Sequence, residues 1–180
     1  IMKIAELAIN GCYLVELSVF EDTRGKFVKT YNQEQFVDTP LSTFNLKEEF
    51  YTISKKNVLR GLHFQSPPAS HSKIVTCIKG AALDFFLDLR KSSETYGKLL
   101  TIELTEDKPN LLYLPVGIAH GFLSLCDDTI LHYKTDHVYS PKDDQGILWS
   151  SVGLDLNGND VIVSDRDSSF PEFKDFVSYF

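Results

Sequence analysis

Residues 73–89 read KIVTCIKGAALDFFLDL, and this stretch decides the predicted fold. Apolar residues recur with a period of two on each side of Lys79-Gly80, which is the period of a half-buried β-strand. Glycine at position 80 favours a turn between the two runs. The stretch therefore predicts two short strands separated by a turn.

The same pattern recurs along the chain. Further strand-like runs cover 13–17, 99–104, 111–114 and 130–133, and turn residues separate them at 22–25, 108–110, 115–117 and 127–128. Thirteen Phe and eight Tyr also favour strands, because aromatic rings fit a pleated, half-buried surface. Helical candidates are few and short: 32–37, with Asn32 as its cap, and 172–178. We expect an all-β fold, closest to a two-sheet jelly roll (a double-stranded β-helix) with short peripheral helices and an interior wide enough for a small ligand.

The chain has 180 residues, 43% of them hydrophobic, which is enough for one sizeable core and excludes disorder. No repeat, low-complexity tract or linker interrupts it, and 153–160 is interpreted as a loop. We expect one domain, 1–180. The formal net charge is −7, with no run of Lys or Arg, so nucleic acid and an anionic membrane surface are not expected partners.

Three cysteines, Cys12, Cys77 and Cys126, have neither an even count nor a CxxC spacing, so we interpret them as reduced thiols. The first residues contain Lys3 and Glu6 and no long apolar stretch, which argues against a signal peptide or a membrane span. A cytoplasmic location is the expectation.

Two strand-like segments each bring a histidine to a strand end: VLRGLHFQ at 58–65 and LPVGIAHGF at 114–122. In the first, simple alternation puts Arg60 and Leu62 on one side and Gly61 and His63 on the other, unless a bulge at Gly61 intervenes. Whether Arg60 and His63 share a cavity is therefore open.

Histidines on two strands of a small barrel suggest a metal site, in which imidazoles and a carboxylate hold zinc, iron or manganese. Metal-binding cupins usually carry His-x-His followed by Glu. Here His63 is followed by Phe64 and Gln65, and Lys73 follows His71, so a cation is disfavoured. We expect no metal and no cofactor.

Acid/base chemistry without a metal is the alternative. It needs a base near neutral pH, for which His63 qualifies if a carboxylate orients it. It needs donors where an enolate oxygen develops, which Lys73 with Arg60 or His120 could supply. Tyr133 is the candidate acid.

The sequence resembles the dTDP-4-dehydrorhamnose 3,5-epimerase family, nucleotide-sugar epimerases with a cupin-like jelly-roll fold. The resemblance covers about 11–171. Its motifs are DTRG at 22–25, the two histidine segments, DLR at 88–90 with TYGK at 95–98, YK at 133–134 with YSP at 139–141, GI at 146–147 before Trp149, and SDRD at 164–167. The resemblance rests on the order and spacing of these motifs taken together.

The resemblance implies a nucleoside-diphosphate 4-keto-6-deoxy sugar as substrate and epimerisation at C3, C5 or both. By similarity, His63 is the base, Asp167 the carboxylate that orients it, Tyr133 the acid on the opposite face, and Lys73 the group that steadies the enolate oxygen. Arg24 and Arg60 are implied to bind the diphosphate. The implied substrate-binding set also contains His120, Lys29, Glu48, Phe50, His71, Tyr139 and Asp144.

Several of these positions depart from the family's usual pattern. Lys29 stands where members of the family generally have an acidic residue. EEFY at 48–51 replaces the Gln-x-Asn-His stretch that is common in the family. His71 replaces Gln, and Asp144 replaces Glu. The catalytic set is intact and the binding set is altered, so a different base, sugar or number of inverted centres is a serious alternative.

Other functions stay open: a sister epimerase on a CDP-, GDP- or heptose-linked sugar, a metal-dependent cupin enzyme, a ketone-moving isomerase, and a non-catalytic sugar-binding barrel. A homodimer is expected by resemblance, and because the strand region at 24–31 leaves an unpaired edge.

Overall fold

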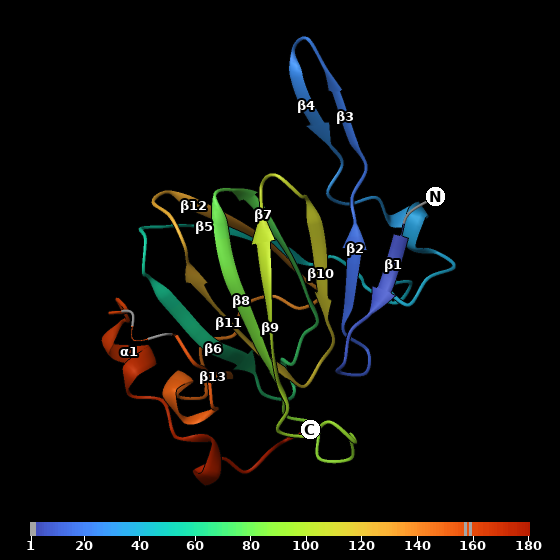
Figure 1. The fold of residues 1–180 in the computed structure, drawn as a ribbon. Coiled ribbons are helices and arrows are strands. Elements are labelled where there is room, and N and C mark those ends of the chain that lie inside the picture. The colour runs from blue at the N-terminus through green and yellow to red at the C-terminus, as the bar shows by residue number, and fades with distance from the viewer. Residues whose placement is uncertain (1–2, 157, 159) are drawn as a thin grey trace.

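The computed structural model describes residues 3–156, 158 and 160–180. Two antiparallel sheets face each other, and a separate two-stranded hairpin projects beyond them (Figure 1). The larger sheet has the order β1 (Lys3–Glu6), β2 (Tyr13–Glu16), β10 (Asn110–Leu114), β7 (Lys73–Lys79), β12 (Thr129–Thr135), β5 (Glu48–Ser54). The smaller has the order β13 (Asp144–Gly146), β6 (Leu59–Gln65), β11 (Ile118–Ser124), β8 (Ala81–Asp88), β9 (Leu99–Thr105). The predicted all-β, two-sheet fold is confirmed.

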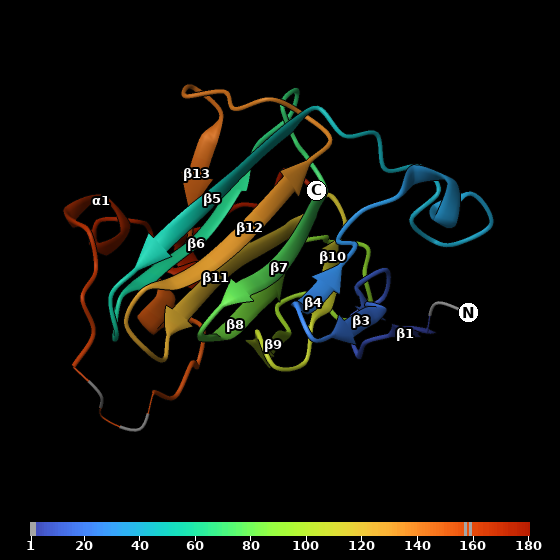
Figure 2. The same cartoon turned by 90° about the horizontal axis from the view of Figure 1, so that it is seen from above.

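The chain crosses from one sheet to the other at Gly80, since β7 and β8 belong to different sheets. Gly80 has φ +77°, and a Cβ there would lie 2.8 Å from both Cys126 Sγ and Thr129 Oγ1. Figure 2 shows β5, β12 and β7 in one layer, with β6, β11 and β8 in the other. Side chains of both layers form the core between them, including Phe86 and Phe122 of the smaller sheet and Leu112 and Leu131 of the larger.

Two further clusters cover the outer faces of the sheets. On the outer face of the smaller sheet, Leu62, Phe64 and Phe85 pack against Phe176 and Phe180 of the C-terminal segment. On the outer face of the larger sheet, Phe36 and Phe44 pack against residues of its strands. Strands β10 and β11 are consequently buried on both faces, so strict alternation of apolar and polar residues is lost there.

Helices are short, as predicted, but their positions differ in part. The 3₁₀ helix η1 (Gln33–Phe36) has Asn32 as its cap, as predicted, and its side chain accepts from the N–H of Glu34. The predicted helix at 172–178 is mostly wrong: only η3 (Phe173–Asp175) forms, because the residues after it pack their aromatic rings on β6. Two helices were not predicted, η2 (Trp149–Ser151) and α1 (Asp165–Ser168). The predicted loop at 153–160 includes residues 157 and 159, which lie outside the described residues.

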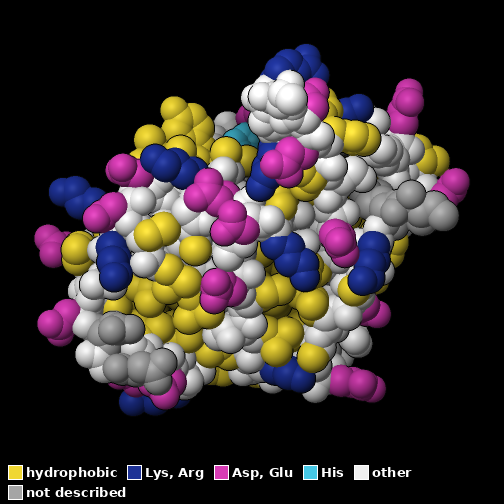
Figure 3. Space-filling view, turned by 45° about the horizontal axis from the view of Figure 1, so that its top comes forward, with side chains coloured by type: hydrophobic (Ala, Val, Ile, Leu, Met, Phe, Trp, Pro, Cys, Tyr) yellow, Lys and Arg dark blue, Asp and Glu magenta, His cyan; other side chains and the backbone are white. Residues whose placement is uncertain are grey.

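The region at 24–31 does not form an edge of either sheet. Strand β4 (Gly25–Val28) pairs with β3 (Val19–Asp22) in the projecting hairpin, whose Phe20 and Phe27 are 64% and 60% exposed. On the face shown in Figure 3, acidic and basic side chains are interspersed rather than gathered by sign. None of the helices in the described part of the chain has the length and apolar character that a membrane crossing requires.

Candidate active site

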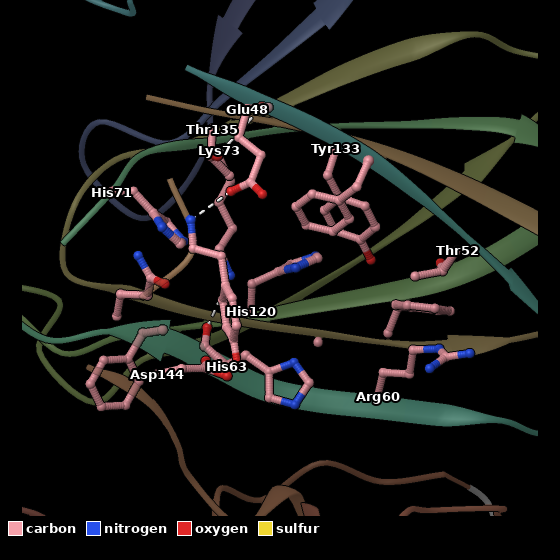
Figure 4. A pocket seen from close by; sticks show the side chains of 16 residues that line it. Glu48, Thr52, Arg60, His63, His71, Lys73, His120, Tyr133, Thr135 and Asp144 are labelled. Atoms are coloured by element: carbon pink, nitrogen blue, oxygen red, sulfur yellow. Dashed lines mark hydrogen bonds between the residues drawn. The ribbon is translucent and has the colours of Figure 1, made fainter. Parts of the chain in front are cut away.

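A cavity of about 390 Å³ lies between the two sheets, within the size range of small-molecule sites. Strands β5, β7 and β12 form one wall and β6 and β11 the other (Figure 4). The lining residues are Glu48, Phe50, Thr52, Arg60, His63, Phe64, Gln65, His71, Lys73, His120, Gly121, Phe122, Tyr133, Thr135, Tyr139 and Asp144.

A bulge in β6 brings Arg60 and His63 into the same cavity. His120 of β11 pairs with His63, and Phe122 pairs with Arg60, so Gly121 alone stands opposite two residues of β6. Gly61 in the bulge has φ +120°, and a Cβ there would lie 2.6 Å from Gly121 Cα. Only glycine fits this approach, and the extra residue shifts the alternation so that both side chains line one wall.

His63 is held by a buried carboxylate. Its Nε2 lies 2.8 Å from Oδ1 of Asp167, and the other oxygen of Asp167 accepts the Gly61 N–H at 2.9 Å. Asp167 sits in α1, where the Ser164 hydroxyl accepts from its N–H. Burial raises the Asp167 pKa, but the hydrogen bonds from His63 and Gly61 outweigh it and hold the pKa below its usual value. An ionised Asp167 accepts from Nε2–H, which leaves the lone pair of His63 on Nδ1.

Lys73 of β7 is almost fully buried next to the backbone of His63. Its Nζ donates to the backbone carbonyl of His63 at 3.2 Å. Burial lowers the Lys73 pKa to about 8, against the opposing charges of Asp144 and Asp84. Lys73 is therefore a cation at neutral pH that loses its proton a little above it.

His120 forms a second pair with an acid, Asp84 of β8, which the sequence analysis missed. Its Nε2 lies 2.8 Å from Oδ2 of Asp84, and both side chains are nearly inaccessible to solvent. Burial raises the Asp84 pKa, while His120 and Lys73 oppose the rise. An aspartate within the apolar run ALDFFLD was the signal available, since a buried acid needs a partner.

Tyr133 of β12 faces the cavity from the opposite wall. Its ring stacks on Phe50, with centroids 4.8 Å apart, and lies edge-on to His120, with centroids 5.8 Å apart. Its hydroxyl points to the side of the cavity where Thr52 and Arg60 lie (Figure 4). Burial and Asp84 raise the Tyr133 pKa well above its usual value, against the lowering effect of Arg60 and Thr52, so the phenol keeps its proton at neutral pH.

The remaining predicted residues in the cavity lie at the end away from Arg60. Glu48 accepts the N–H of Tyr139 at 2.6 Å, and Asp144 pairs with Arg166 at 2.7 Å. Both ring nitrogens of His71 are buried without a hydrogen-bond partner among the described residues. Burial, with the charges of Lys73 and His137, lowers the pKa of His71 to about 3, so it is neutral at ordinary pH.

Arg24 and Lys29, both predicted to bind substrate, do not line this cavity. Arg24 lies at the hairpin turn, with 88% of its side chain exposed and its guanidinium bound to Asp22 at 2.6 Å. Lys29 follows β4 and is exposed. Arg24 and Lys29 therefore lie apart from the other predicted binding residues of the same chain, because the hairpin extends away from the sheets (Figure 1).

The metal hypothesis needs converging ligands. Among the described residues, no three His, Cys, Asp or Glu side chains converge in this way. His63 and His120 each turn Nε2 to a separate aspartate, Asp167 and Asp84. The two imidazoles are thus arranged as two oriented His-Asp pairs.

Comparison with known proteins agrees with this geometry. The family model described as dTDP-4-dehydrorhamnose 3,5-epimerase matches residues 6–175. The chain belongs to this family. It is 35% identical over 181 residues to the dTDP-4-dehydrorhamnose 3,5-epimerase of Shigella flexneri, covering 99% of both chains. The cupin-like jelly roll of the chain matches the fold of solved members of this family.

Two solved structures illustrate the range of the family. The dTDP-4-dehydrorhamnose 3,5-epimerase of Sulfolobus tokodaii superposes with a TM-score of 0.91 at 34% identity, over 99% of each chain. A 3′-monoepimerase of Streptomyces bikiniensis in complex with dTDP-quinovose superposes with a TM-score of 0.85 at 26% identity, over 92% of this chain and 85% of that one. The same fold therefore occurs in a 3,5-epimerase and in a 3′-monoepimerase.

Proposed function

We propose that this protein inverts C3 and C5 of a dTDP-linked 4-keto-6-deoxy sugar by removing and returning protons next to the ketone. One observation carries the proposal: an aspartate-oriented histidine on one sheet and a protonated tyrosine on the other line the same cavity, together with a lysine and a second histidine. The family membership agrees with it.

The first step removes a proton from carbon. Nδ1 of His63 takes the proton from C3 or C5, and the electron pair of the C–H bond becomes the enolate, with its negative charge on the C4 oxygen. The imidazolium that forms is stabilised by Asp167 through the bond to Nε2. The Lys73 ammonium lines the same cavity and is available to donate to the C4 oxygen, while His120, whose Nε2 is engaged with Asp84, lines the wall beside it.

The second step returns a proton from the other side. Tyr133 donates its hydroxyl proton to the opposite face of the same carbon, and the enolate electrons reform the ketone. The phenolate then regains a proton and His63 loses one, so the cycle consumes nothing. Two such rounds, one at each carbon bonded to the C4 ketone, invert both centres.

The test is solvent exchange. Incubating the protein with dTDP-4-keto-6-deoxyglucose in deuterated water should place deuterium at C3 and C5 of the inverted product. A His63→Ala variant should show neither exchange nor inversion. Absence of deuterium at both carbons with dTDP-, CDP- and GDP-linked 4-keto sugars would overturn the proposal.

A second candidate is inversion of one centre or of a sugar carried on another base. It is favoured by Phe50, which places an apolar ring in the cavity wall, and by the 3′-monoepimerase that shares the fold. NMR of the products across the three nucleotide classes distinguishes these outcomes, because each inverted centre has its own coupling constants.

We further propose that the protein acts as a homodimer in the cytoplasm, with Arg24 binding the diphosphate in the partner's cavity. The hairpin projects from its own chain, and its exposed Phe20 and Phe27 favour burial against another surface. In this arrangement the Arg24 guanidinium does not reach the cavity of its own chain. The free cysteines suit a reducing compartment.

Subunit mixing tests this arrangement. Arg24→Ala and His63→Ala are each expected to be inactive alone. Unfolded and refolded together in equal amounts, they should recover about one quarter of the wild-type activity, because half the dimers are mixed and each holds one complete site. No recovery, or a monomer in analytical ultracentrifugation, would contradict the proposal.

A further inference from the structure

Phe50 is an exposed aromatic residue that lines the cavity, and its ring stacks on that of Tyr133. We propose that Phe50 is a positioning residue that holds the Tyr133 phenol in the orientation from which it protonates the substrate, and so sets how often proton removal ends in inversion. This inference rests on the proposed epimerase function and deepens it.

The contact is built into the register of the larger sheet. Phe50 of the edge strand β5 stands directly opposite Tyr133 of β12. Their rings are stacked, with centroids 4.8 Å apart and planes at 11°. Directly opposed side chains are the closest neighbours that two antiparallel strands provide, and paired aromatic rings add attraction beyond the area they bury.

Burial does not explain Phe50. Its side chain is 45% exposed, whereas Tyr133 is 7% exposed. Alternation along β5 turns Phe50 and Thr52 to the cavity and Tyr51 to the other face. Phe50 therefore contributes little to the core, and its ring covers a face of the Tyr133 ring that would otherwise meet solvent at the cavity mouth.

The Tyr133 ring is in contact with two neighbouring rings as a result. Phe50 lies flat on one side of its ring, and the His120 ring meets it edge-on with centroids 5.8 Å apart. His120 is itself fixed by Asp84. A phenol confined in this way has few rotamers available, so its hydroxyl stays on the side where Thr52 and Arg60 lie (Figure 4).

The enolate has two fates, and only one of them needs Tyr133. If the imidazolium of His63 exchanges its proton with solvent and returns it to the same face, the substrate is recovered with a deuterium label and no inversion. If Tyr133 delivers the proton, the centre inverts. A loosely held phenol slows the second fate and leaves the first unchanged, so the ratio of labelled substrate to product reports the positioning of Tyr133.

The experiment measures that ratio at low conversion in deuterated water, with dTDP-4-keto-6-deoxyglucose as the probe. Phe50→Leu removes the ring and keeps apolar bulk, and it should raise the ratio about three- to tenfold. Phe50→Tyr keeps a stacking ring and should stay within about twofold of wild type. Tyr51→Ala is the matched control, because it removes a ring from the same strand on the other face.

An unchanged ratio in Phe50→Leu would overturn the inference, as would an equal rise in Tyr51→Ala, which would point to a general loosening of β5. Phe50→Met, with unfolding followed by circular dichroism, replaces Phe50→Leu if the latter does not fold. Absence of exchange in the wild-type protein would instead refute the proposed function, so the two failures are distinguishable.

Discussion

Replacing Asp167 with asparagine is the sharpest test of how His63 is activated. The substitution keeps the size of the side chain and an oxygen that accepts the Gly61 N–H, so the bulge of β6 should persist. It removes the negative charge 2.8 Å from Nε2 of His63. The charge matters after proton removal, when the imidazole becomes an imidazolium.

The expected loss follows from the geometry. Two unit charges about 4 Å apart attract by about 4 kcal/mol at the effective dielectric constant of about 20 that suits protein sites. Because 29% of the His63 side chain is exposed, solvent screens part of this and we take about 2–3 kcal/mol. That corresponds to a decrease in kcat of about 30- to 150-fold. KM should change little, since the ground-state imidazole is neutral.

The assay is the initial rate of deuterium entry at C3 and C5, followed by NMR across a range of substrate concentrations. Asp165→Asn is the control, because Asp165 is an exposed acid in the same short helix. It should retain kcat within about twofold. If Asp167→Asn kept kcat within about threefold of wild type, or if the two substitutions had equal effects, the role of Asp167 in stabilising the imidazolium would be refuted.

Three further predictions concern other groups. Tyr133→Phe should abolish inversion while solvent label still enters recovered substrate, and loss of both in mass spectrometry would contradict its role as the acid alone. Since the pKa of Lys73 in the ligand-free protein is lowered to about 8 and its ammonium is the active form, kcat/KM should be half-maximal near pH 8 and fall about tenfold per pH unit above it; a flat profile to pH 10 would contradict this. Phe86→Ala, in the fully buried core, should lower the free energy of unfolding by about 3–5 kcal/mol in urea titrations; a loss below 1 kcal/mol would show that the core collapses around the gap.

Much of the fold could be predicted because strand signals are local. The runs around Val75 and Leu131 each contain enough alternation and flanking turn chemistry to identify a strand from a few residues. The helix α1 was missed since it has only four residues, too few for a helical period. Its position depends on the bridge between Val58 and Ile162, two residues far apart in the chain.

The candidate site was predicted less evenly. His63, Lys73 and Tyr133 stand in motifs that indicate acid/base chemistry, and all three line one cavity. Asp84 was missed because its partner His120 lies on a neighbouring strand, which no local pattern shows. Arg24 was placed with the others, although the projecting hairpin separates it from them.

The amino-acid sequence alone determined the chemistry of this protein: which groups can take, give or stabilise a proton, and which segments extend as strands, since both are properties of single residues and their immediate neighbours. The tertiary structure decided which of these groups meet. The bulge at Gly61 turns Arg60 and His63 into the same cavity, and the pairing of β5 with β12 lays Phe50 on Tyr133. Such contacts depend on register between strands that are distant in the chain, and register is settled by packing across the whole sheet.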